Sequence, residues 1–148
     1  MYKDKFGNII GVGEDTTYKI ATLLMPSKYH VGRQALLSVL IGSDNANFLD
    51  VEYRKHKIDI VIYDREISNF VGVIRIQGKD HTSGKKGISH QQKSLKDKNL
   101  KKIFKDNNLW ICDILFTECP NIFKEQLNWD SVIEFCNMMK MAGVKLRN

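Results

Sequence analysis

The sequence of 148 residues has only two prolines, three cysteines and no long apolar run, and each scarcity excludes a class of protein. Three cysteines at 112, 119 and 136 are too few for a disulfide framework, and they lack the CxxC spacing of a zinc site. The most apolar run, 35–41, is far shorter than the roughly 20 residues of a membrane span. Because the opening segment MYKDKFGNII has no apolar region typical of a secretory signal, we expect a cytoplasmic protein.

The remaining composition is typical of a folded domain. Hydrophobic residues make up 43% of the chain and charged residues 27%, which excludes extensive disorder. The length fits one domain over 1–148. A chain of this size buries enough apolar surface to be stable without a disulfide or a structural metal.

Positive charge is concentrated in one segment. The net charge is +6, and residues 79–106 hold nine lysines against three aspartates, which equals the whole excess. A phosphate backbone is the simplest partner for such a segment, so we expect nucleic acid, and DNA in the first instance. A lysine-rich helix that is only solvated is the open alternative. The candidate nucleic-acid-binding residues are Lys85, Lys86, Lys93, Lys98, Lys101 and Lys105.

Hydrophobic periodicity predicts helices in the first third of the chain and strands in its centre. Helices are expected from residue 13 to about residue 26 and over 33–41, after a short hairpin within 1–12. Alternation and β-branched residues predict three strands in close succession, which we expect to form an antiparallel meander. These strands are 48–53, 58–63 and 70–77.

The second half of the chain completes a mixed α/β order. A helix is expected from Ser89 to about Lys105, followed by an apolar strand at 109–116 and a last helix from Trp129. A strand reached through a helical crossover lies parallel to the strand before it. The predicted fold class is therefore α/β, with a three-strand antiparallel meander, a crossover helix and a fourth parallel strand, flanked by helices.

Polar residues on two neighbouring predicted strands carry the candidate chemistry. Asp59 interrupts an Ile/Val strand, so this acid must be satisfied by a partner or point out of the core at the strand end. The period of two places Arg75, Gln77 and Lys79 on one side of the third strand and its extension. A carboxylate beside a polar-x-lysine pair is the arrangement of a magnesium-dependent phosphodiesterase.

At these residues the sequence resembles the PD-(D/E)xK nuclease superfamily, nearest to small bacterial domains of unknown function related to very-short-patch repair endonucleases. The resemblance covers about residues 50–116, with KIDIVIYD at 57–64 preceding VIRIQGKDH at 73–81. It implies a restriction-endonuclease-like fold and Mg²⁺ held by Asp59 and Gln77. The catalytic residues that it implies are Asp59, Gln77, Lys79 and His81.

Two alignments with the superfamily are open. In the first, Gln77-x-Lys79 occupies the (D/E)xK position, and the amide oxygen of the glutamine replaces an acid as a metal ligand. In the second, aligned on Gly78 and His81 as in the repair-like branch, Arg75 and Gln77 fall on positions that are usually acidic, and the site is inactive. Glu14 offers a further acid, although the helix dipole alone also favours an acid in a first turn.

The sequence thus predicts a nucleic-acid-binding protein of nuclease fold with at most weak magnesium-dependent cleavage. One alternative is a catalytically inactive member of this fold that serves as a binding or scaffold module. Another is a protein-interaction domain that uses its lysine-rich helix.

Overall fold

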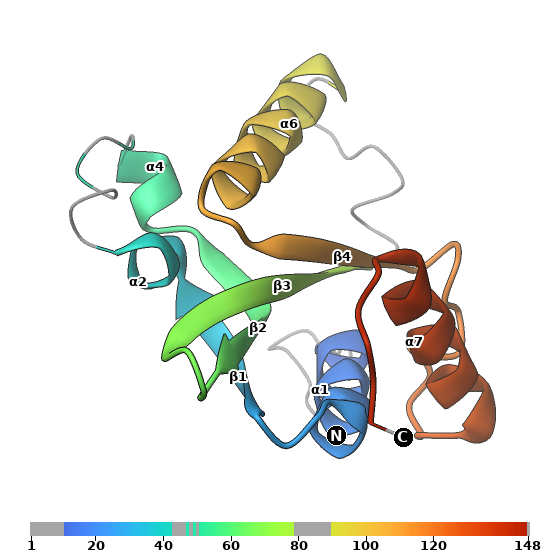
Figure 1. Ribbon diagram of the computed structural model, residues 1–148. Coiled ribbons are helices and arrows are strands. Elements are labelled where there is room, and N and C mark those ends of the chain that lie inside the picture. Colours follow the sequence, from blue (N-terminus) through green and yellow to red (C-terminus); the bar gives the residue numbers. More distant parts are fainter. Residues whose placement is uncertain (1–10, 43–46, 48, 50, 79–89, 148) are drawn as a thin grey trace.

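One four-stranded sheet organises the computed structural model, which describes residues 11–42, 47, 49, 51–78 and 90–147 (Figure 1). The strand order is β1-β2-β3-β4, with both β1–β2 and β2–β3 antiparallel and β3–β4 parallel. In chain order the elements are α1 (Val12–Leu24), β1 (Tyr29–Leu36), α2 (Leu37–Ile41), α4 (Val51–Arg54), β2 (Lys57–Asp64), β3 (Asn69–Gln77), α6 (His90–Asp106), β4 (Trp110–Leu115) and α7 (Trp129–Met141).

The structure confirms the predicted centre of the sheet. Ile60 of β2 faces Ile74 of β3 in an antiparallel register, and Val73 of β3 faces Ile111 of β4 in a parallel one. Helix α6 makes the crossover between the two parallel strands, as the length of the connection requires. The mixed α/β class is therefore established, whereas the restriction-endonuclease-like fold remains a prediction.

The first strand of the meander was predicted in the wrong place. The strand that pairs with the outer side of β2 is β1, which includes the first half of the helix expected over 33–41. Pairing with β2 along the whole of β1 overrides the local helix propensity of this leucine-rich segment. The expected strand 48–53 instead ends in the short helix α4, and Leu49 and Tyr53, four residues apart, pack on the same cluster.

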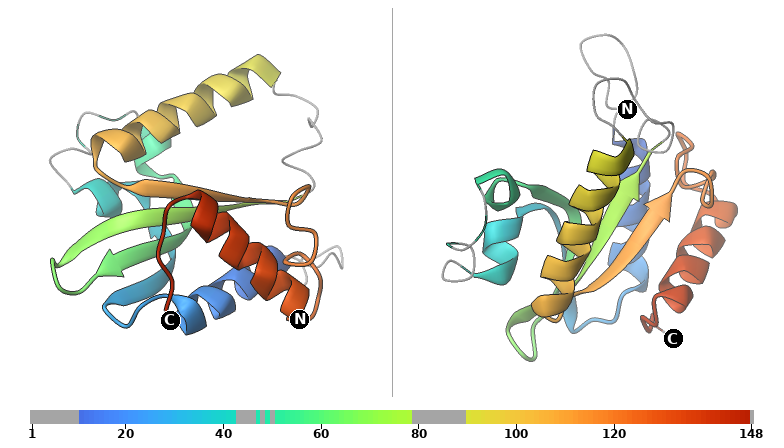
Figure 2. Two further views of the ribbon diagram at one scale, coloured as in Figure 1. Left: turned by 45° about the vertical axis from the view of Figure 1, so that its right-hand side comes forward. Right: turned by 90° about the horizontal axis from the view of Figure 1, so that it is seen from above.

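Helices cover both faces of the sheet. Figure 2 shows α1 and α7 together on one face, with α6 lying across the other on the same side as α2 and α4. The last helix begins where it was predicted because Asn128 caps it: its side chain accepts from the backbone N–H of Ser131, whose hydroxyl accepts from the Asn128 N–H in return. The layers therefore form a helix–sheet–helix sandwich.

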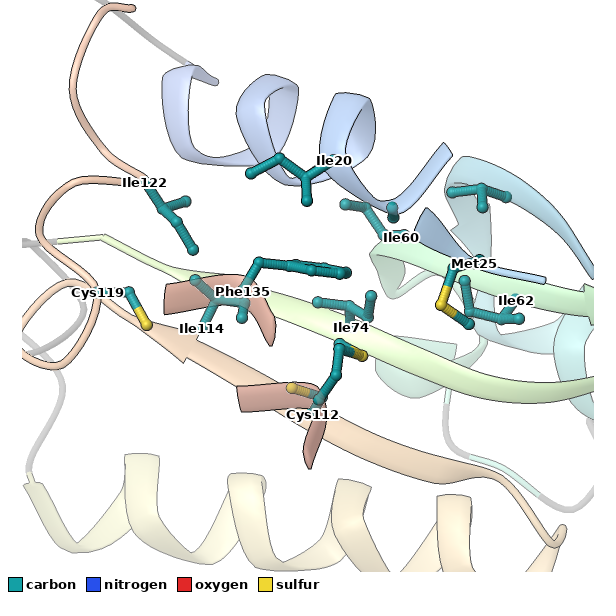
Figure 3. Packing of buried hydrophobic residues seen from close by; sticks show 13 residues of the cluster. Ile20, Met25, Ile60, Ile62, Ile74, Cys112, Ile114, Cys119, Ile122 and Phe135 are labelled. Atoms are coloured by element: carbon teal, nitrogen blue, oxygen red, sulfur yellow. The ribbon is translucent and has the colours of Figure 1, made fainter. Parts of the chain in front are cut away.

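Each face of the sheet has its own apolar cluster. On the α1 and α7 face, Ile20 and Phe135 pack over Ile60 and Ile74 (Figure 3). On the other face, Phe104 of α6 lies in a second cluster. The further members of the second cluster are Leu37, Leu40, Ile41, Ile58, Val61, Val73, Leu100 and Leu109. Residues 1–10 of the expected hairpin lie outside the described residues, and Val12 begins α1.

Within the described part of the chain, no helix has both the length and the apolar content that crossing a bilayer requires.

Candidate functional site

Asp59 lies where β2 and β3 separate. The antiparallel ladder ends at the pair Ile60 and Ile74, two residues before Ile76. The backbone N–H of Ile76 donates to the Asp59 carboxylate over 2.8 Å. The next residue, Gln77, accepts on the β4 side from the N–H of Phe116, so the Ile76 N–H faces the opposite side, toward β2. The carboxylate thus replaces a missing strand acceptor, which explains how an acid is accommodated in this strand.

The alternation of side chains between the two faces of the sheet is interrupted in β2 at the same residue. Side chains two residues apart on a regular strand share a face, yet Ile58 and Ile60 lie in different clusters on opposite faces of the sheet. On the other side of β2 the register pairs Arg33 with Ile60 and Ala35 with Ile58, and the residue between them on β1, Gln34, has a positive φ of 53°. This backbone conformation is uncommon for a residue other than glycine. Two irregularities therefore coincide at Asp59.

Glu14 is brought to this end of the sheet by the first turn of α1. A Cβ on the preceding residue, Gly13, would lie 3.1 Å from the Ile76 side chain, so the start of α1 packs directly on the end of β3. The Glu14 carboxylate accepts from Arg33 over 2.8 Å and from the side-chain amide of Gln34. Glu14 is therefore at the same end of the sheet as Asp59, and it is already engaged by two donors from β1.

Gln77 ends β3 beside this junction, and its side chain is half-buried. Alternation places it on the same face as Arg75, the face that α6 covers. Its predicted partners Lys79 and His81 lie outside the described residues. The structure thus places Asp59 and Gln77 at one end of the sheet.

Arg75 lies in a charge network rather than at this junction. Its guanidinium donates to both carboxylate oxygens of Asp113 on β4, over 2.7 and 2.8 Å, and to Asp97 on α6. Lys101 approaches Asp97 to 3.3 Å and Asp113 to 3.8 Å. We call these four residues the arginine network.

The arginine network shifts the pKa values of Arg75 and Asp97. Burial alone would lower the pKa of Arg75, but the hydrogen bond and charge of Asp113, followed by those of Asp97, raise it. Burial would raise the pKa of Asp97, but the hydrogen bond and charge of Arg75, followed by Lys101, lower it. Both shifts favour the charged forms of Arg75 and Asp97, and Arg75 is satisfied without any ligand.

The donors at the sheet end have the chemistry that Mg²⁺ prefers, but they carry little charge. Asp59 supplies a carboxylate and Gln77 a neutral amide oxygen, and hard divalent cations take such oxygen ligands. Among the described residues, no group of three or more His, Cys, Asp or Glu side chains is placed to hold a metal ion. The pair therefore offers oxygen donors of the kind that a divalent ion takes, with the charge of a single carboxylate.

Helix α6, which lies across one face of the sheet (Figure 2), carries several exposed lysines. Lys98, Lys102 and Lys105 are exposed, at spacings of four and three residues that place them on one stripe. Within the described part of the chain they make no ion pair, whereas Lys101 is held in the arginine network. The side chain of Lys93 and the whole of Lys85 and Lys86 lie outside the described residues.

The sequence analysis missed the arginine network. Arg75 and Asp113 each interrupt an apolar strand, and these strands were predicted to be parallel neighbours. Opposite charges in adjacent buried strands are a signal for pairing, because an unpaired charge in either position is costly. Applying this rule to both strands together would have removed Arg75 from the candidate site.

Comparisons with protein-family models, with curated proteins and with solved structures give no match for this chain. Its functional assignment therefore depends on the residues described above.

Proposed function

We propose that this protein binds nucleic acid through the outer stripe of α6, which we call the lysine face and define by Lys98, Lys102 and Lys105. The observation that carries the proposal is that these three ammonium groups are exposed, aligned and without an ion pair among the described residues. Such groups can neutralise successive phosphates and release their counterions. By contrast, Lys101 has carboxylate partners, so its charge is already partly compensated.

The attachment of α6 to the sheet supports this function. Leu100 and Phe104 bury the inner side of the helix, and the arginine network joins its middle to β3 and β4. The lysine face is therefore presented by an element of fixed orientation. Contacts from lysine to phosphate carry little information about base sequence, so affinity should depend weakly on sequence.

The test is fluorescence anisotropy with labelled duplex and single-stranded oligonucleotides at low salt. Lys98→Glu/Lys102→Glu is expected to weaken binding by about tenfold or more, since two phosphate contacts are replaced by repulsion. Lys124→Glu/Lys140→Glu is the matched control: both lysines are exposed, the change in net charge is the same, and neither lies on α6.

Two results would contradict the proposal. Wild-type protein that binds none of the oligonucleotides has no nucleic-acid surface under these conditions. Equal losses in the two double variants would show that binding follows net charge and has no defined face. In either case a solvated lysine helix or a protein-interaction role would replace the proposal.

Metal-dependent cleavage at the sheet end is the second candidate function. The observation that favours it is the position of the Asp59 carboxylate beside β3. This carboxylate accepts a hydrogen bond from the backbone N–H of Ile76, the residue that precedes Gln77. Asp59 and Gln77 would hold the ion, which would polarise the phosphate and activate water. One carboxylate contributes half the charge of a pair, so we expect only weak binding of Mn²⁺ by calorimetry.

Two isosteric changes test this second candidate. Asp59→Asn should abolish the binding of Mn²⁺, whereas Gln77→Glu should strengthen it by adding a second carboxylate. If millimolar Mn²⁺ does not bind, or if it binds equally to wild type and Asp59→Asn, the sheet end is not a metal site. The nucleic-acid-binding proposal does not depend on that result.

A further inference from the structure

A cavity of about 680 Å³ lies on the face of the sheet opposite α6. It forms where the turn before β1, the first residue of β4 and the C-terminal tail (143–147) meet. The tail is tied at both ends of its course: Val144 N–H donates to the Met139 carbonyl over 2.9 Å, and Arg147 N–H to the Leu24 carbonyl over 2.6 Å. Backbone hydrogen bonds therefore hold the tail that forms one wall of the cavity, and the volume lies in the range typical of small-molecule sites, about 300–1,000 Å³.

One wall of the cavity is the indole of Trp110. A Cβ added at Gly72 on β3 would lie 2.0 Å from Trp110 Cε2, so the ring rests directly on the strand and needs glycine beneath it. The side chain is only half-buried and lines the cavity. An immobilised indole with an accessible side is a platform on which a planar ring can stack.

Positive charge stands at the rim of the same cavity. The exposed Lys28 and Lys145 both line it. The ammonium of Lys28 lies over the Tyr29 ring, 5.1 Å from its centroid, and 3.9 Å from Asp64, the outer limit of an ion pair. Lys145 has no ion pair within the described part of the chain. The rim therefore carries net positive charge, which favours an anion.

We propose that this cavity binds a planar aromatic anion of the size of a nucleoside monophosphate. The ring would stack on Trp110, and the phosphate would lie between the ammonium groups of Lys28 and Lys145. The sheet separates this site from the lysine face, so the two are independent. Neither a nucleoside without phosphate nor inorganic phosphate alone satisfies both halves of the site.

The test uses tryptophan fluorescence of the full chain. The protein contains two tryptophans, and Trp129 is 80% exposed and does not line the cavity, so Trp129→Phe leaves Trp110 as the only reporter. Adding AMP should quench this fluorescence to saturation, and adenosine or inorganic phosphate should bind at least about fivefold more weakly.

Charge reversals on the same background locate the site. Lys145→Glu should weaken the binding of AMP by about fivefold or more, whereas Lys140→Glu, an exposed lysine outside the cavity, should leave it unchanged. Circular dichroism would establish that both variants are folded. Absence of saturable quenching by millimolar AMP would overturn the proposal, as would adenosine binding equal to AMP or equal effects of the two reversals.

Discussion

Three charged side chains interrupt the apolar strands, and they are satisfied in two different ways. Asp59 accepts from the Ile76 backbone at the point where two strands part. Arg75 and Asp113 satisfy each other across the parallel pair β3 and β4. The sequence predicts that such residues need partners, but it does not say whether the partner is a backbone group, a side chain or a ligand.

The hydrogen bond between the Ile76 N–H and the Asp59 carboxylate can be tested without a metal. Asp59→Ala removes the acceptor of the Ile76 N–H and should lower the free energy of unfolding by about 1–3 kcal/mol. Asp59→Asn keeps an oxygen in the same place and should cost much less. Urea denaturation of the three proteins measures both effects. Equal losses in the two variants would show that the charge, and not the hydrogen bond, stabilises the fold.

The buried cysteines should be unreactive in the folded protein. Burial, with a smaller contribution from Asp113, raises the pKa of Cys112 to about 12, and burial likewise raises that of Cys119 to about 11. Only the thiolate is a good nucleophile, so both remain protonated thiols at neutral pH. Ellman's reagent at pH 8 should therefore label at most the half-buried Cys136 rapidly, and all three cysteines after unfolding. Rapid native labelling of two or more thiols would contradict this packing.

At the scale of elements, the arginine network decides how α6 is attached. Arg75 comes from β3, Asp113 from β4, and Asp97 and Lys101 from α6. The bidentate pair with Asp113 uses the planar fork of the guanidinium, which a lysine cannot reproduce. The network therefore fixes the helix that carries the lysine face against the parallel pair β3 and β4.

Removing the central charge should be costly at neutral pH. Arg75→Met leaves Asp113 and Asp97 without their main partner, and we expect a loss of stability on the order of 3 kcal/mol. Arg75→Lys should recover only part of it. Urea denaturation at pH 7 measures both values. A change below about 1 kcal/mol for Arg75→Met would show that the network contributes little.

The network also predicts how stability depends on pH. The pKa of Asp97 is lowered from its ordinary value of 3.8 in the folded protein, so the unfolded chain binds more protons in this range. Its contribution is therefore present above pH 3.8 and is lost as the pH falls through the folded pKa. Because Arg75→Met removes the main cause of this lowering, the difference in stability between wild type and variant should shrink as the pH falls below 3.8. A constant difference between pH 7 and pH 3 would contradict this role.

Some helices and strands could be predicted from the sequence and others could not. Strands β2, β3 and β4 carry β-branched, apolar runs whose length and spacing indicate strands wherever they lie in the fold. Segment 33–41 was ambiguous: its leucines suit a helix, but its first half pairs with β2. Segment 48–53 alternates as a strand does, but β1 already occupies the free side of β2. Both mistakes arise because strand order is set by tertiary pairing and not by local pattern.

In the whole molecule, the two proposed binding sites lie on opposite faces of the sheet. The helix on one face of the sheet carries the aligned lysines that make no ion pair with any described residue, and the opposite face carries the cavity at Trp110. The sequence predicted the lysine-rich helix because its charge is a local property. It did not predict the cavity, because Lys28, Trp110 and Lys145 are distant in the sequence and meet only in the folded chain.

The central claim is that the lysine face contacts phosphates, and the salt dependence of oligonucleotide binding tests it most directly. For wild type, the logarithm of the association constant should fall linearly with the logarithm of the salt concentration. In Lys98→Glu/Lys102→Glu the magnitude of this slope should decrease by about two, one for each lost phosphate contact. In Lys124→Glu/Lys140→Glu the slope should equal that of wild type. A slope that is unchanged in the α6 variant, or reduced equally in both, would contradict the account.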